Sequence, residues 1–109
     1  MNRFTPRVLF LSILLVPITM SAAGKSTVRG WLSDEDCATG RANDGRYTGT
    51  NPDCAKKCVH DGKKIVLVDP EHKRLLVILN QESATERVGD FVEISGDLDE
   101  HAKHFMLNR

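Results

Sequence analysis

Three residues of this 109-residue chain carry a reactive sulfur, and all three, Cys37, Cys54 and Cys58, lie between Gly30 and Gly62. Thiols can form disulfides, attack electrophiles or bind soft metal ions. A bridge from Cys37 to Cys54 or to Cys58 would close a loop of about 15 to 20 residues and stabilise the fold by on the order of 3 kcal/mol. The sequence does not choose between these two pairings. A bridge between Cys54 and Cys58 is disfavoured, because consecutive helical turns hold the two side chains nearly parallel.

The odd number of cysteines leaves one outside any bridge within the chain. That residue can be a buried apolar side chain, can form a disulfide-linked dimer, or can serve as a reactive thiol or metal ligand. For a metal site, three thiolates and one imidazole from His60, His101 or His104 would form a tetrahedral, sulfur-rich set suited to zinc or cuprous copper. The spacing is not that of a familiar zinc finger, and an oxidising compartment favours disulfides over metal binding.

Further candidates lie in the glycine- and asparagine-rich stretch between the first two cysteines, where Arg41, Arg46 and Tyr47 could bind a partner. Trp31 and the phenylalanines are expected to pack in the core instead. The acidic run 34–36 lacks EF-hand spacing and is expected to be the polar end of a strand. No nucleophile elbow, P-loop, Ser-His-Asp order or nucleotide-binding glycine motif is present in the sequence. We therefore expect neither an enzyme nor a bound cofactor.

Short β-rich and alternating segments must position these residues. Strands are predicted at residues 27–32, 64–69, 75–79, 91–98 and 103–107, with 64–69 and 75–79 forming a hairpin buried on both faces. Residues 38–52 contain many Gly, Asn and Asp residues without periodicity and are predicted to form a loop. A short helix is predicted over 52–59, capped by Asn51, started by Pro52 and ended at Gly62. On it, Cys54 and Cys58 share one face.

Five short strands, with a polar turn or helical turn at 80–87 between the third and fourth, follow the element order of an OB-fold. The predicted fold is therefore all-β with a minor helix: a small five-stranded OB-like barrel with a loop-helix insertion after its first strand. An open five-stranded sheet or another small barrel would produce a similar pattern. Residues 24–109 form one domain, because neither a repeat nor a linker divides them.

Residues 1–23 have the features of a signal peptide. Arg3 and Arg7 precede an apolar run at 8–15, and Ser21, Ala22 and Ala23 provide the small residues that signal peptidase recognises. The apolar run is shorter than the roughly 20 residues that a membrane-spanning helix needs. We expect cleavage after Ala23, a periplasmic or secreted protein, and no membrane association afterwards.

Charge makes nucleic acid an unexpected partner. Lysine and arginine total 15, as do aspartate and glutamate. Cleavage removes two arginines and no acid, which leaves a net charge of about −2, whereas neutralising phosphates requires a clear basic excess.

The mature chain resembles a group of small exported bacterial proteins of unknown function. The matching segments are residues 30–34 with Cys37, 47–52, 54–59, 62–68 and 92–96, which include the pattern G-W-L-S-D-x2-C and C-x3-C-V-x2-G. The resemblance implies an OB-like barrel and an extracytoplasmic location, and it implies no reaction. Many members of the group have a histidine four residues after the first cysteine, where this chain has Arg41.

Two hypotheses of different classes follow. The first is a non-enzymatic, disulfide-stabilised barrel that binds an unidentified protein or small molecule through residues 41–50. The alternative is a thiol protein that uses Cys37, Cys54 and Cys58 to bind zinc or copper, or for redox exchange.

Overall fold

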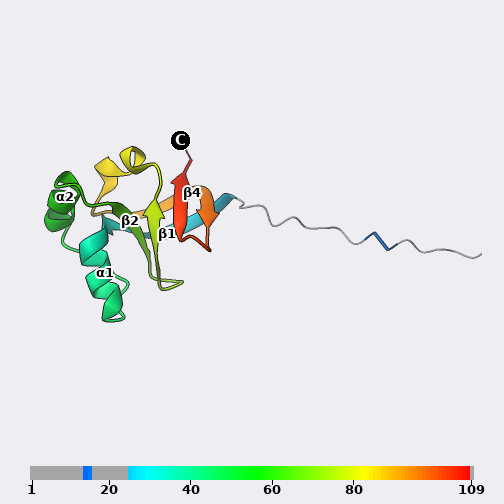
Figure 1. Cartoon of the computed structure of the whole chain (residues 1–109), viewed down its shortest axis with the longest axis horizontal. Helices are drawn as coiled ribbons and strands as arrows, with labels where there is room; N and C mark the ends of the chain where they lie inside the picture. Colours follow the sequence, from blue (N-terminus) through cyan, green and yellow to red (C-terminus); the bar gives the residue numbers. More distant parts are fainter. Residues whose placement is uncertain (1–13, 16–24, 109) are drawn as a thin grey trace, which may run out of the picture.

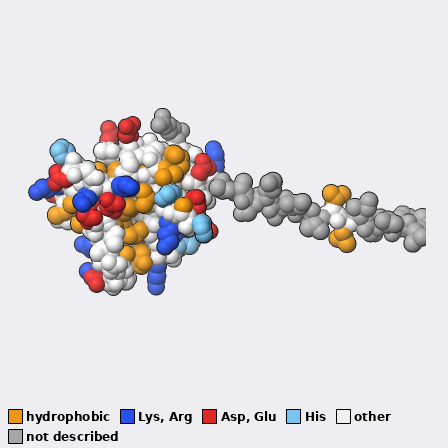
Figure 2. All heavy atoms as spheres, viewed as in Figure 1, with side chains coloured by type: hydrophobic (Ala, Val, Ile, Leu, Met, Phe, Trp, Pro, Cys, Tyr) orange, Lys and Arg blue, Asp and Glu red, His pale blue; other side chains and the backbone are white. Residues whose placement is uncertain are grey.

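The structure is a computed structural model that describes residues 14–15 and 25–108 (Figure 1). The predicted signal peptide, except for Leu14 and Leu15, lies outside the described residues. Within the described ranges, no helix has the length and apolar character needed to cross a membrane. On the face shown in Figure 2, basic and acidic side chains are interspersed.

Residues 25–108 form a closed barrel of five strands in the order β1-β2-β3-β5-β4. The strands are β1 (Lys25–Asp34), β2 (Ile65–Asp69), β3 (Arg74–Ile78), β4 (Phe91–Asp99) and β5 (His104–Leu107). Neighbouring strands are antiparallel except for β3 and β5, which are parallel. The predicted small OB-like barrel with little helix is confirmed.

Side-chain alternation places the core inside this barrel. Val28 and Leu32 of β1 are buried, whereas Arg29 between them is exposed. Every residue of β2 is buried, as predicted, because a helix covers its outer face: Ala38 packs there against Val66 and Val68. The barrel therefore has an inner core and a smaller apolar cluster on its outside.

Glycines are required where strands of the barrel approach each other closely. A Cβ atom at Gly30 would collide with the carbonyl oxygen of Val68, and one at Gly96 would collide with that of Met106. Gly96, predicted from its place in a strand to mark a bend, is buried where β4 pairs with both β1 and β5. These two positions have no space for a side chain.

We expect Gly30→Ala and Gly96→Ala each to lower the free energy of unfolding by roughly 1–3 kcal/mol or more, because backbone must move to relieve the overlap. Gly40→Ala is the matched control, since a Cβ atom there meets nothing within 4 Å and the residue is helical. This control should be neutral or more stable by about 0.5–1 kcal/mol. Urea unfolding of the three variants measures the difference, and equal stability of all three would contradict the close-approach explanation.

The insertion after β1 contains two helices, α1 (Glu35–Asn43) and α2 (Pro52–His60). The prediction that residues 38–52 form a loop is therefore wrong for their first part. Asp34 starts α1 by accepting a hydrogen bond from the Cys37 backbone N–H at 3.0 Å, and Glu35 and Asp36 occupy the first turn. A side-chain cap and the burial of Ala38 on β2 thus stabilise a helix whose composition resembles a loop.

The second helix is as predicted. Asn51 caps α2 by accepting hydrogen bonds from the backbone N–H groups of Asp53 and Cys54, and Pro52 occupies the first helical position. Gly62 follows the helix with a φ of +99°, the left-handed conformation that glycine adopts without strain.

Candidate functional site

The end of β1 and the two helices place three chemistry-bearing side chains together. Asp34 is both the last residue of β1 and the N-cap of α1, Cys37 lies in the first turn of α1, and Cys58 lies in the last turns of α2. One potential ligand atom from each lies within 4.8 Å of the other two. We call these three residues the thiol-carboxylate cluster.

Asp34 is the least satisfied member of this cluster. It is 0% exposed, and its Oδ2 accepts the capping hydrogen bond from Cys37. Its Oδ1 has no hydrogen-bond partner among the described residues. A buried polar atom without a partner costs about 1–3 kcal/mol, and more when it is charged. The cluster therefore offers an electron-rich oxygen that a cation would satisfy.

The electrostatic environment keeps the two neighbouring thiols protonated. Burial raises the pKa of Cys37 to about 11, assisted by its hydrogen bond to Asp34 and by the Asp34 charge. Burial and the same charge also raise the pKa of Cys58, although its contact with Cys37 acts in the opposite direction. Activated cysteines have a lowered thiol pKa. The cluster therefore lacks the signature of a catalytic nucleophile.

The metal set predicted from sequence comes together only in part. Cys37 and Cys58 meet, but the cluster includes neither Cys54, which is exposed, nor His60, whose side chain is 90% exposed and lies 3.8 Å from Asp61. His101 is exposed and His104 is half-buried at the start of β5. Asp34, which sequence reasoning had assigned to the polar end of a strand, takes the third position.

All three cysteines are free thiols in this structure, so the predicted disulfide is not formed in it. The structure nevertheless separates the two pairings that the sequence left open. Cys58 lies beside Cys37, whereas Cys54 is exposed. Geometry thus supports Cys37 with Cys58 as the pair that could be oxidised.

Glu35 and Asp36, which follow Asp34 in the acidic run 34–36, contact other residues outside the cluster. Glu35 accepts a hydrogen bond from the Lys64 backbone N–H, and Asp36 forms an ion pair with Lys63 at 3.0 Å. Both contacts connect α1 to the segment after α2. They hold the two helices together around the cluster.

The predicted binding residues Arg41, Arg46 and Tyr47 lie at the end of α1 and just after it, where the Arg46 backbone N–H donates to the Arg41 carbonyl oxygen at 2.8 Å, but the two arginine side chains have different partners. Arg41 donates to Thr48 Oγ1 at 3.3 Å, and Arg46 donates to Asp44 at 3.3 Å. Tyr47 is half-buried and packs on the outer apolar cluster. The segment after α1 therefore folds against the barrel through Tyr47, and of the three residues Arg46 is the exposed one.

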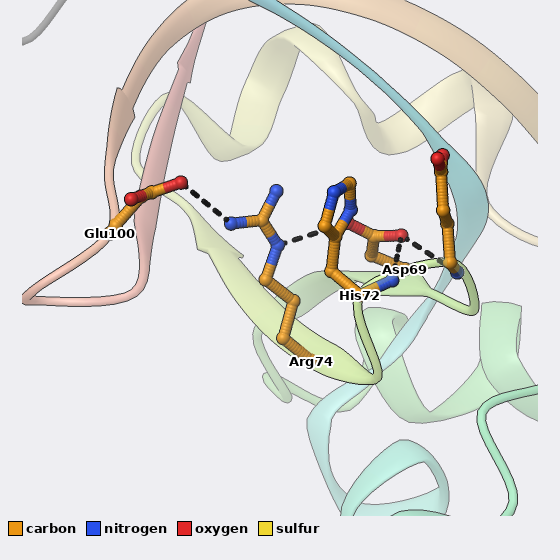
Figure 3. Close-up of polar contacts among 5 residues, drawn as sticks. Asp69, His72, Arg74 and Glu100 are labelled. Carbon is orange, nitrogen blue, oxygen red and sulfur yellow. Dashed lines mark hydrogen bonds and ion pairs between the residues drawn. The ribbon is translucent and has the colours of Figure 1, made fainter.

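A second polar cluster surrounds Asp69 at the turn between β2 and β3 (Figure 3). Asp69 is 1% exposed and accepts hydrogen bonds from the backbone N–H groups of Glu71 and His72. Its Oδ2 lies 2.8 Å from His72 Nδ1 and accepts from Arg74 Nε at 2.9 Å, while Arg74 also reaches Glu100 at 3.4 Å. An aspartate and histidine at this distance can belong to a catalytic triad, but here they close a hairpin turn.

These hydrogen bonds change how readily Asp69 takes up a proton. Burial raises the pKa of its carboxyl group, but the hydrogen bonds from His72 and Arg74 outweigh burial, and the net pKa is lowered. Asp69 therefore stays charged at neutral pH and accepts these hydrogen bonds as a carboxylate.

The fold and the site together define a small five-stranded closed β-barrel protein with a partly buried thiol-carboxylate cluster where β1 joins two inserted helices. Comparisons with protein-family models, with curated proteins and with solved structures give no match for this chain. The geometry of the site is accordingly the basis for the function proposed below.

Proposed function

We propose that this chain is an exported, non-enzymatic barrel protein that holds a zinc ion in its thiol-carboxylate cluster. The observation that carries the proposal is the buried Asp34 carboxylate, whose Oδ1 has no hydrogen-bond partner within residues 25–108 and which lies beside two thiols. Thiolates and a carboxylate are both zinc ligands, whereas cuprous copper prefers sulfur and imidazole ligands to carboxylate oxygen. A mixed set of two sulfurs and one oxygen therefore favours zinc over copper.

The distances in the cluster are close to those that zinc requires. Zinc binds sulfur at about 2.3 Å and carboxylate oxygen at about 2.0–2.2 Å, so tetrahedral ligands lie roughly 3.3–3.8 Å apart. The ligand atoms of Asp34, Cys37 and Cys58 already lie within 4.8 Å of one another. Small side-chain movements are enough to close the site, and a water molecule would complete four-coordination.

Export and the absence of catalysis have separate support. The basic and apolar N-terminal segment followed by small residues supports export to the periplasm or the medium. The sequence contains no recognised catalytic motif, which supports a non-enzymatic role.

The test is native mass spectrometry of the mature, exported chain after incubation with one equivalent of zinc. We expect one zinc ion per chain, and with cobalt as a replacement we expect the charge-transfer absorption of cobalt-thiolate bonds. Cys37→Ser and Cys58→Ser should each remove both signals. Cys54→Ser is the matched control and should retain them, because Cys54 is exposed and outside the cluster. Zinc binding that requires Cys54 would contradict the assigned ligand set.

A second candidate role for the same pair is a structural disulfide, because Cys37 and Cys58 lie side by side. In this reaction both thiols lose their protons and form a sulfur-sulfur bond, while the disulfide of an oxidising partner protein is reduced to two thiols. Intact mass after alkylation without reductant distinguishes the two roles: a bridged chain takes one alkyl group, on Cys54, whereas a chain stripped of zinc takes three. Cys54 is also the exposed thiol from which a disulfide-linked dimer would form.

A further inference from the structure

A cavity of about 500 Å³ opens between α2 and the connection from β3 to β4. That connection consists of two short 3-10 helices, η1 (Gln81–Ser83) and η2 (Thr85–Arg87). Figure 2 shows hydrophobic and charged side chains together at the end of the molecule that carries α2. No member of the thiol-carboxylate cluster is among the described residues that line the cavity. The cavity is thus a separate feature of the fold.

The inner wall of the cavity is apolar. Ile65 and Val88 are each 1% exposed and belong to the barrel core, and Val59 of α2 packs against that core. Half-buried Val59 presents hydrocarbon to the space between α2 and the barrel, and Ile65 and Val88 close the wall behind it. A ligand that fills this space must have an apolar body.

The polar groups of the inner wall already have partners within the chain. The Gln81 side chain accepts a hydrogen bond from the Ile65 backbone N–H at 2.6 Å and donates to the Ile65 and Ile78 carbonyl oxygens. Thr85 Oγ1 donates to the Gln81 carbonyl oxygen at 3.1 Å. The inner wall therefore offers little hydrogen bonding to a ligand, and recognition of a polar group must occur at the rim.

The rim is positively charged. Lys56, Lys63 and Lys64 line the cavity together with a single acid, Glu82. Lys63 is engaged with Asp36 at 3.0 Å. Among the ion pairs of residues 25–108, none involves Lys56 or Lys64, so both ammonium groups can pair with a ligand. The rim therefore selects a negatively charged group.

We infer that this cavity binds a small organic anion with an apolar body, of the chemical class of medium-chain carboxylates. The hydrocarbon part would pack against Val59, with Ile65 and Val88 behind it, and the carboxylate would lie between Lys56 and Lys64 at the opening. The cavity volume lies within the roughly 300–1,000 Å³ that small-molecule sites have. This inference is independent of the zinc site, because the two regions share α2 but no ligand residue.

The test uses decanoate below its micelle concentration and the mature chain, with binding followed by titration calorimetry and by amide NMR shifts. We expect saturable binding of one decanoate per chain that weakens as salt is added. Decyltrimethylammonium, which has the same hydrocarbon length and the opposite charge, should bind at least roughly tenfold more weakly. Equal binding of the two probes would overturn the charge assignment and with it the proposal.

Two variants and one control locate the binding. Thr85→Trp places a large ring in the cavity from an exposed position and should abolish binding, whereas the double variant Lys56→Glu, Lys64→Glu should weaken it roughly tenfold. Lys57→Glu, on the same helix but outside the cavity lining, should bind as the wild type does. If Thr85→Trp fails to fold, the double variant decides alone. Unchanged binding by the double variant, or the same loss in Lys57→Glu, would overturn the proposal.

Discussion

The substitution Asp34→Asn is expected to lower zinc affinity by roughly 100-fold or more, since even residues that only support metal ligands change affinity 10- to 100-fold. The metal-free variant should be as stable as the wild type or more stable. Asparagine has nearly the same shape and is an equally good N-cap, so the Cys37 backbone N–H keeps its acceptor. What the variant loses is a fully buried carboxylate whose Oδ1 has no partner in the described chain.

Thermal unfolding without zinc measures the stability of the metal-free variant, and thermal unfolding with zinc measures the loss of zinc affinity. At zinc concentrations about 100 times the dissociation constant, binding stabilises the wild type by about 2.7 kcal/mol, which corresponds to roughly 10–20 °C for a domain of this size. Asp34→Asn should lose nearly all of this shift, whereas the control Cys54→Ser should keep it. A large loss of stability in metal-free Asp34→Asn would instead show that the carboxylate charge serves the fold alone.

The barrel could be predicted from sequence because its signals are local. The apolar runs that became β2 and β3 and the alternation of Val92 and Ile94 with polar neighbours report burial directly. Helix α1 was missed because Gly40 and Asn43 weaken its helical propensity. Its stability depends on tertiary structure: it packs against β2 through Ala38, which is distant in sequence from that strand.

The candidate site could be predicted only in part, for a related reason. Cysteines are identified by type, so Cys37 and Cys58 were named, but residue type alone does not distinguish the buried Asp34 from its exposed neighbour Asp36. A signal was present: an aspartate three residues before a cysteine at the end of a strand can cap a helix and hold that cysteine beside its carboxylate. The half-buried position of Tyr47 was not predicted, because a segment without periodicity can still fold onto an apolar surface.

The substitution Asp69→Ala is expected to lower the free energy of unfolding by about 3–5 kcal/mol, because a largely buried arginine loses its buried partner and keeps only the exposed Glu100. Asp69 is 1% exposed, and the Arg74 side chain that donates to it is 17% exposed. The turn between β2 and β3 also loses the acceptor for two backbone N–H groups. Glu100→Ala is the matched control, since its 76% exposed carboxylate pairs with the same arginine, and it should cost about 0–1 kcal/mol.

The difference in unfolding free energy between the wild type and Asp69→Ala should depend on pH. This dependence shows whether Asp69 stabilises the turn by its charge or by its shape. Hydrogen bonds hold the pKa of folded Asp69 below its ordinary value of 3.8, so below pH 4 the unfolded chain takes up a proton at this residue more readily than the folded chain. The stability that the Asp69 charge contributes is therefore fully present above the ordinary pKa of 3.8. It is lost as the pH falls through the lower pKa that Asp69 has in the folded chain. Urea unfolding should show the full difference between wild type and Asp69→Ala at pH 5 to 7, and a smaller one in stronger acid. A difference that stays the same in strong acid would mean that Asp69 stabilises the turn by its shape and not by its charge.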